Sequence, residues 1–144
     1  MVKIKTAGYS GTPLAKKLGI KESFNIKVIN QPDYYLDLFS DLPASAKIIY
    51  GSVANDDEKK NLIHYFTKES GELGKSIVKL KSEIKQDGII WVSWPKKSSK
   101  VPTDITEDVV REIALKNGLV DIKVCAIDEI WSGLKLVIPV KDRK

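Results

Sequence analysis

The sequence predicts an α/β fold: a single open, mostly parallel sheet of six strands, with helices on both faces and an antiparallel last strand. Two observations carry this prediction. Short apolar strands alternate with helical segments along the 144 residues, a pattern typical of parallel strands joined by crossover helices. In the stretch 88–139 a strand and a helix are followed by two strands with a tight link between them, and so short a link requires an antiparallel pair.

The first predicted element is a short helix. Thr12 is its N-cap candidate, Pro13 suits its first position, and Gly19 suits the left-handed position after its end. We expect residues 1–22 to form an N-terminal helical segment that packs on the sheet, and residues 1–144 to form one α/β domain.

Three strands and one helix follow. Short apolar runs predict strands at 24–30, 46–51 and 62–68. Pro32 and Asp33 are typical of a helix start, so we expect a helix between the first two of these strands.

The second half of the chain carries two longer helices. Apolar residues recur every three or four positions from Leu73 to Ile84, which predicts an amphipathic helix lying on the sheet. That helix should be capped by Ser70 and should end at Asp87 and Gly88.

The remaining elements are a helix and the closing strands. The helix is expected within 103–118, where Asp104 and Glu107 have the spacing of a capping box. The last strand, 134–140, should return antiparallel at the edge of the sheet.

Parallel strands place their carboxyl ends along one side of a sheet, where ligands bind in open α/β folds. The residues that the prediction collects at this carboxyl-end edge are Asn30, Gly51, Thr67, Trp94, Pro95 and Asp128. A binding site is therefore expected there.

The charge of the chain is positive but scattered. There are 24 lysines and arginines against 19 acids, a net charge of +5, and only Arg111 and Arg143 are arginines. Nucleic-acid footprints are usually clustered and rich in arginine, so we interpret the excess mainly as solvating charge and expect no nucleic-acid partner. No apolar run approaches the ~18 residues that span a bilayer, and no apolar leader follows the N-terminus. We expect a cytoplasmic protein with no membrane partner.

The sharpest local feature is the loop after the fourth predicted strand. Lys96, Lys97 and Lys100 stand beside the hydroxyls of Ser98 and Ser99. Ammonium and hydroxyl groups together can hold a phosphate or a carboxylate. Acids in the first turn of the next helix already complement its positive end, so the lysines rather than that helix would hold the anion. The alternative interpretation is a solvated turn.

Tryptophans stand out in a chain that is 8% aromatic. Strand alternation places Trp91 with Ser93 on one face of the sheet and Trp94 on the other. We expect Trp94 and Trp131 to meet at the carboxyl-end edge, where they either stack on a ligand or close a core. The ligand-binding residues predicted from the sequence are Asn30, Trp94, Lys96, Lys97, Ser98, Ser99 and Trp131.

No stretch has the spacing of a catalytic constellation. His64 is the single histidine, and without an evident orienting partner it is interpreted as a structural residue of a strand. Cys125 is expected to be a buried, inert thiol, and one histidine with one cysteine are too few ligands for a nitrogen and sulfur metal site. Asp128 and Glu129 have the chemistry for acid/base work, but adjacent residues of a turn usually point apart. We predict no catalytic residues and no metal site.

The stretch 8–13 contains two glycines before a helix, which invites comparison with a phosphate loop. It lacks the GK[ST] ending and a preceding strand, so backbone geometry is the favoured interpretation of these glycines.

Longer motifs support two resemblances. The segments GYSGTPLAKKLGI at 8–20, WVSWPKKSS at 91–99, TDITEDVVRE at 103–112 and GLVDIKVCAIDEIWSGLK at 118–135 resemble a prokaryotic family of small uncharacterised proteins. That family brings no activity, substrate or cofactor with it. The architecture of residues 87–140 is similar to the second half of class I S-adenosylmethionine methyltransferases, which implies a Rossmann-like, methyltransferase-like fold.

The resemblance to methyltransferases would imply S-adenosylmethionine as a cofactor. Those enzymes have a glycine-rich turn after the first strand and an acid after the second, whereas this chain has INQPDYY at 29–35 and then Gly51 with Ser52. We therefore expect no cofactor, S-adenosylmethionine included.

The sequence favours a non-catalytic binding or regulatory protein with a small anionic ligand at the carboxyl ends of the strands. Two alternatives remain open: a reduced S-adenosylmethionine-dependent methyltransferase and a nucleic-acid-binding protein.

Overall fold

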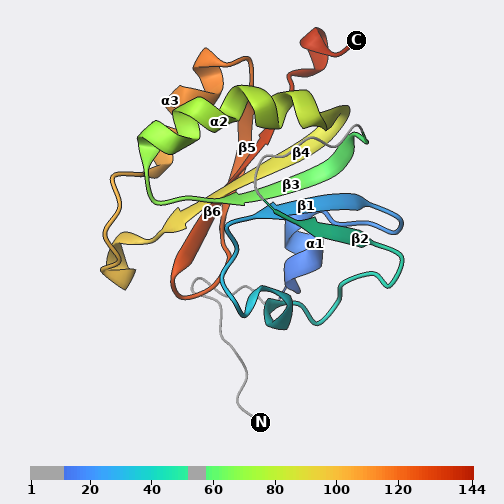
Figure 1. Cartoon of the computed structure of the whole chain (residues 1–144), viewed down its shortest axis with the longest axis horizontal. Helices are drawn as coiled ribbons and strands as arrows, with labels where there is room; N and C mark the ends of the chain where they lie inside the picture. The colour runs from blue at the N-terminus through green and yellow to red at the C-terminus, as the bar shows by residue number, and fades with distance from the viewer. Residues whose placement is uncertain (1–11, 52–57) are drawn as a thin grey trace.

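The computed structural model describes residues 12–51 and 58–144. At its centre is one six-stranded sheet in the order β2-β1-β3-β4-β6-β5 (Figure 1). The strands are β1 (Asn25–Ile29), β2 (Lys47–Tyr50), β3 (Lys60–Phe66), β4 (Ile84–Pro95), β5 (Val120–Ala126) and β6 (Trp131–Val137). Neighbouring strands are parallel from β2 to β4, whereas β6 is antiparallel to both β4 and β5. The predicted fold class is confirmed.

The place of the last strand corrects the prediction, which put it at the edge. β6 lies between β4 and β5, and β5 is the edge strand. Leu134 and Leu136 of β6 are buried on one face and Trp131 is buried on the other, whereas Ile122 and Val124 of β5 are exposed. An interior strand is covered on both faces, so burial distinguishes β6 from β5 where hydrophobicity alone does not.

Helices cover both faces of the sheet, as predicted. Within the described ranges the helices are α1 (Leu14–Leu18), α2 (Ser70–Glu83) and α3 (Glu107–Lys116), with short 3-10 helices η1 (Tyr35–Leu38), η2 (Lys97–Ser99) and η3 (Val140–Asp142). α2 and α3 lie side by side on one face, and α1 lies on the other (Figure 1). No helix in the described part of the chain is long and apolar enough to cross a membrane.

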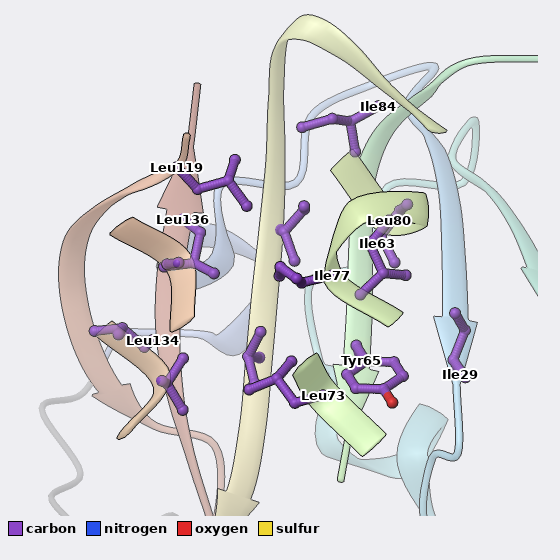
Figure 2. Close-up of a cluster of buried hydrophobic side chains, with 14 of the residues drawn as sticks. Ile29, Ile63, Tyr65, Leu73, Ile77, Leu80, Ile84, Leu119, Leu134 and Leu136 are labelled. Carbon is purple, nitrogen blue, oxygen red and sulfur yellow. The ribbon is translucent and has the colours of Figure 1, made fainter. Parts of the chain in front are cut away.

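The larger core lies between the sheet and the pair α2 and α3. Figure 2 shows side chains of α2 gathered with those of the strands, and Leu73, Ile77 and Leu80 are completely buried among them. Complete burial of one such side chain contributes roughly 1.5–3 kcal/mol. The apolar spacing that predicted an amphipathic helix therefore also fixes α2 on the sheet.

A second core lies on the face that α1 covers. Leu14 and Leu18 of α1 pack there with Tyr35 of η1 and Trp91 of β4, and all four are almost completely buried. The indole N–H of Trp91 donates a hydrogen bond to the Leu18 carbonyl over 2.9 Å. Gly19 follows in the left-handed conformation (φ 84°) and ends α1 as predicted.

α2 ends earlier than the sequence pattern predicted. Its last residue is Glu83, and Ile84, which was expected in the helix, begins β4. A register shift separates the pairing of Ile84 with Lys60 from the regular ladder between β3 and β4. At Gly88 an added Cβ would lie 2.9 Å from the Lys85 carbonyl oxygen. Gly88 therefore permits a close backbone approach inside a strand and does not end a helix.

The cap of α2 comes from a distant carboxylate. Asp104 was expected in a capping box with Glu107, but its carboxylate accepts hydrogen bonds from the backbone N–H and the hydroxyl of Ser70, each over 2.7 Å. Thr106 takes the N-cap position of α3 and accepts a hydrogen bond from the Val109 N–H. Ser70 is thus the residue that is capped, because α2 and the segment before α3 lie close together in the fold.

α1 is capped in the same way. Pro13 occupies the N-cap position that was expected for Thr12. The N–H groups of Ala15 and Lys16 donate to the two carboxylate oxygens of Asp41, each over 3.0 Å. A carboxylate at this end of a helix also complements the helix dipole.

The helix expected after Pro32 and Asp33 is reduced to the single turn η1. Tyr35 begins it with a hydrogen bond from its N–H to the Pro32 carbonyl. Tyr35 is buried, whereas Leu36 is 51% exposed. Leu38 and Phe39 pack beside Tyr35 against the second core and are partly buried, so a single turn is enough to place the apolar side chains of this segment.

Candidate functional site

The carboxyl ends of β1 to β5 lie along one side of the sheet, as the prediction required. Asn30, directly after β1, has a left-handed backbone conformation (φ 61°), which asparagine tolerates better than most residues. Its side-chain amide donates a hydrogen bond to the Phe66 carbonyl at the end of β3 over 3.2 Å. The Asn30 amide therefore links the ends of two strands.

Asp128 organises the turn between β5 and β6. One carboxylate oxygen, Oδ1, accepts hydrogen bonds from the N–H groups of Ile130 and Trp131 over 2.8 and 2.7 Å. The other, Oδ2, accepts one from the Tyr34 hydroxyl over 2.8 Å. The side chain is buried, with only 3% of Asp128 exposed. Asp128 is therefore a structural acceptor of the turn, which is the turn chemistry expected from the sequence.

Tyr34, directly before η1, covers part of the carboxyl-end edge. Burial raises the pKa of its hydroxyl to about 12, and the hydrogen bond to Asp128 and the charge of that carboxylate act in the same direction. Glu129, the neighbour of Asp128, is exposed. The two adjacent acids differ in their surroundings and do not form a carboxylate pair.

Lys96 lies beside this turn. Its backbone N–H donates to the Ile130 carbonyl over 2.7 Å, and its side chain is half-buried. Burial lowers the pKa of the Lys96 ammonium; the Asp128 carboxylate opposes that shift, and the ammonium of Lys17 adds to it. Lys17 of α1 is anchored nearby, since its Nζ donates to the Ala126 carbonyl at the end of β5 over 3.1 Å. Two ammonium groups from distant parts of the chain thus meet at the carboxyl-end edge.

The rest of the lysine loop is the turn η2. Lys97 and Ser98 are exposed. The Ser99 hydroxyl donates to the Lys96 carbonyl over 2.6 Å and accepts a hydrogen bond from the Val101 N–H. Ser99 therefore shapes the turn, while Lys97 and Ser98 present their polar groups to solvent.

The expected meeting of Trp94 and Trp131 is wrong. Trp94 belongs to the core beneath α2 and α3, whereas Trp131 packs on the opposite face of the sheet with Trp91. The ring of Trp131 meets that of Phe66 edge to face, with centroids 5.0 Å apart. Register places Trp131 opposite Pro95 rather than Trp94, and strand alternation then separates the two indoles.

His64 has hydrogen-bond partners that sequence reasoning missed. Its Nδ1 lies 2.9 Å from the Tyr35 hydroxyl and its Nε2 lies 2.8 Å from the Ser93 hydroxyl. Complete burial lowers the pKa of the imidazole to about 3, and the ring stacks on Phe66 with centroids 4.2 Å apart. A serine beside a histidine is the pattern of a nucleophile and its base, but no part of Ser93 or His64 is exposed. The network is structural, as expected for His64.

Cys125 was expected to be buried, but it is only partly buried at the margin of the second core. Burial raises the pKa of the Cys125 thiol, which disfavours the reactive thiolate. In the described ranges no three histidine, cysteine or acidic side chains gather as metal ligands would. The glycine-containing stretch 8–11 lies outside the described residues.

A family model and known structures match this chain. The model of the family described as "Protein of unknown function (DUF3052)" matches residues 15–140, in agreement with the predicted resemblance to uncharacterised proteins. A comparison with curated protein sequences gives no match.

Solved methyltransferase structures share the fold. Magnesium protoporphyrin IX methyltransferase (ChlM) from Synechocystis PCC 6803 with bound SAH has a TM-score of 0.58 and 10% identity, covering 86% of this chain and 78% of that one. A putative methyltransferase from Thermoplasma acidophilum has a TM-score of 0.53 and 8% identity, covering 90% and 74%. An O-methyltransferase (NcsB1) from neocarzinostatin biosynthesis, in complex with S-adenosylmethionine, has a TM-score of 0.59 and 10% identity, covering 81% of this chain but 49% of that one. At such identities the likeness is one of fold, and the predicted methyltransferase-like architecture is confirmed.

Proposed function

The chain belongs to the DUF3052 family of proteins of unknown function, and we propose that it is a non-catalytic binding protein that holds a small anion beside Lys96. The proposed site lies at the carboxyl ends of the strands, where open α/β sheets bind their ligands. Lys17, Lys97 and Ser98 would contribute further donors.

The observation that carries this proposal is the contrast between engaged acceptors and available donors at this edge. The Asp128 carboxylate already accepts three hydrogen bonds, and the Asn30 amide is bonded to a strand end. By contrast, Lys96, Lys97 and Lys100 form no ion pair with any residue in 12–51 or 58–144. An anion would meet charged donors there, and the exposed Glu129 is a carboxylate near enough to act on the charge of Lys96.

The residues at the end of β1 do not fit S-adenosylmethionine, the ligand of the methyltransferases that share this fold. The turn from Asn30 to Tyr35 contains no glycine. The Asn30 side chain is bonded across to β3, Tyr34 is bonded to Asp128, and Tyr35 is buried in the core. A backbone that approaches a cofactor closely usually needs glycine, so we derive no methyl-transfer step.

Inorganic phosphate is the probe that tests the proposed anion site. Calorimetry at low ionic strength should show phosphate binding to the full chain, and the double variant Lys96→Ala/Lys97→Ala should bind about tenfold or more weakly. The melting temperature of this variant should stay close to that of the wild type, because Lys96 is only half-buried and Lys97 is exposed.

A matched control removes the same charge elsewhere. Lys75 of α2 and Lys85 at the start of β4 are exposed and lie away from the carboxyl ends of the strands, and Lys75→Ala/Lys85→Ala should bind phosphate like the wild type. Equal affinity in both double variants, or a large loss of stability in Lys96→Ala/Lys97→Ala, would contradict the proposed site.

The methyltransferase alternative is favoured by the fold likeness alone, and one titration decides it. Calorimetry with S-adenosylhomocysteine at high micromolar protein should give no binding heat. A saturable heat would restore the enzyme hypothesis.

A further inference from the structure

The lysines around Lys96 continue along the outer strands of the sheet. Lys123 of β5 and Lys135 of β6 are direct partners in the antiparallel pair. Side chains of direct partners lie on the same face with Cβ atoms about 5 Å apart, and like charges placed there destabilise a sheet. This pair therefore lowers the stability of the fold unless an anion lies between the two ammonium groups.

A third lysine adds to this concentration of charge. Burial lowers the pKa of the Lys135 ammonium, and the charges of Lys123 and Lys21 lower it further. Lys21 follows α1, so the cluster joins the helix side of this face to the strand side. None of the three lysines forms an ion pair within the described ranges.

The acids nearest to this cluster in the sequence are engaged elsewhere. The carboxylate of Glu22 accepts a hydrogen bond from the Ser45 hydroxyl. Asp121 of β5 pairs with Arg111 of α3 over 3.0 Å. Neither acid forms an ion pair with the lysines, so their charge is left for an external anion.

Cys125 connects the cluster with the carboxyl-end edge. It lies two positions after Lys123, hence on the same face of β5, and its cross-strand partner Gly133 has no side chain to cover it. Burial raises the pKa of the Cys125 thiol, while the ammonium groups of Lys17, Lys123 and Lys96 oppose the rise. Lysines of both groups thus lie near enough to Cys125 for their charges to act on its thiol. We call the surface formed by Lys17, Lys21, Lys96, Lys123 and Lys135 the basic strip.

We propose that the basic strip binds linear polyphosphate, a proposal that rests on the proposed function because Lys96 belongs to both. Lys123 and Ala126, whose carbonyl anchors Lys17, lie roughly 10 Å apart along β5 at about 3.3 Å per residue. Flexible lysine stems let one phosphate contact two of these ammonium groups, whereas contact with all five lysines of the strip at once requires a chain of phosphates. Lysine acts as a point charge on a flexible stem, which suits a linear anion of variable shape.

The composition of the strip favours a phosphate chain over a nucleic acid. Arg111 of α3 donates to Glu107 of α3 and to Asp121 of β5, and Arg143 follows η3 and donates to the Ile138 carbonyl. The exposed ring of Tyr50 is on β2, at the opposite edge of the sheet. Proteins bind nucleic acids with arginine guanidinium groups, which contact phosphates, and with exposed aromatic rings, which stack on bases. The basic strip consists of lysines instead.

Calorimetry of the full chain with long-chain polyphosphate and with orthophosphate tests this inference. Lys123→Ala/Lys135→Ala should bind polyphosphate about tenfold or more weakly and orthophosphate within about twofold of the wild type. Lys96→Ala/Lys97→Ala should weaken binding of both ligands, and Lys75→Ala/Lys85→Ala should weaken binding of neither. The melting temperature of Lys123→Ala/Lys135→Ala should equal or exceed that of the wild type, because a like-charge pair is removed.

Three results would overturn the inference. Equal losses of affinity in Lys123→Ala/Lys135→Ala and Lys75→Ala/Lys85→Ala would mean that net charge alone attracts polyphosphate. A loss confined to Lys96→Ala/Lys97→Ala would leave the proposed function standing without the strip, whereas unchanged orthophosphate binding in that variant would contradict the proposed function itself. Displacement of polyphosphate by a more tightly bound single-stranded oligonucleotide would assign the strip to nucleic acid.

Discussion

The Tyr34 hydroxyl donates a hydrogen bond to Oδ2 of Asp128 over 2.8 Å, across 94 residues of sequence. This bond ties the segment after β1 to the turn between β5 and β6 at the edge where related folds bind their ligands. The same turn supplies the carbonyl of Ile130 that fixes the backbone of Lys96. The Tyr34 to Asp128 contact therefore closes one part of the edge and positions the proposed anion site beside it.

Loss of this bond should lower stability in a pH-dependent way. Tyr34→Phe removes one donor from a buried carboxylate, and we expect a destabilisation of about 1 kcal/mol in urea unfolding at pH 7. The folded pKa of Tyr34, about 12, lies above its ordinary value of 10.0. The contribution of the protonated hydroxyl is therefore complete below pH 10 and is lost as the pH rises through 12.

The matched control for this prediction is Tyr50→Phe. Tyr50 is 46% exposed on the edge strand β2, so the same chemical change there should leave stability unaltered. The advantage of the wild type over Tyr34→Phe should shrink above pH 10. An advantage that persists unchanged at pH 12 would show that the hydroxyl is not bonded to Asp128.

His64 should remain neutral through the physiological range. Its folded pKa of about 3 lies below its ordinary value of 6.5 because it is completely buried. The neutral ring therefore stabilises the fold fully above pH 6.5, and this contribution is lost as the pH falls toward 3, with a limiting slope of about 1.4 kcal/mol per pH unit.

The single histidine makes this prediction direct to measure. The imidazole proton resonances of the folded protein should not move between pH 8 and pH 5 in NMR spectra, and His64→Gln should flatten the loss of stability between pH 6.5 and pH 5. A titration midpoint near pH 6.5 in the folded protein would contradict the buried network with Tyr35 and Ser93.

Replacement by alanine should have opposite effects on stability at two glycines. At Gly88 an added Cβ would lie 2.9 Å from backbone oxygen of Lys85, and we expect Gly88→Ala to destabilise by about 1–3 kcal/mol. At Gly74, on the exposed side of α2, nothing lies within 4 Å of the added Cβ, so Gly74→Ala should stabilise by about 0.5–1 kcal/mol. Chemical denaturation measures both. A neutral Gly88→Ala would contradict the close backbone approach at the start of β4.

The effects of Asp104 and Ser70 on the stability of α2 should be coupled. Asp104→Ala should lower the melting temperature, and amide exchange at the start of α2 should accelerate, because Ser70 loses both of its hydrogen bonds to that carboxylate. The effects of Ser70→Ala and Asp104→Ala should not add in the double variant, since both remove the same hydroxyl contact. Strict additivity would rule out the contact.

Much of the fold followed from local patterns. The alternation of strands and helices, the amphipathic spacing in α2 and the short link before β6 were enough to predict the sheet and its antiparallel last strand. The order of β5 and β6 was not predictable in this way, because both strands carry apolar residues and only burial distinguishes the interior strand from the edge. The capping of α2 by Asp104 depends equally on which segments meet in space.

The site was less predictable for the same reason. Alternation correctly separated Trp91 from Trp94, yet the expected contact of Trp94 with Trp131 required a register that β4 and β6 do not have. The partners of His64 lie 29 residues away on either side of it in the sequence. Lys123 and Lys135 appear in the sequence as ordinary surface charges, and only their cross-strand pairing brings them together.

The most direct test of the central claim is an NMR titration of the backbone amides with orthophosphate and, separately, with S-adenosylhomocysteine. A non-catalytic anion-binding protein should show phosphate-dependent shifts at Lys96, Lys97 and Ser98, and S-adenosylhomocysteine should leave Asn30 and Gly51 unmoved. The claim would be contradicted if the amide resonances of Asn30 and Gly51 shifted saturably with S-adenosylhomocysteine while those of Lys96, Lys97 and Ser98 did not shift with phosphate.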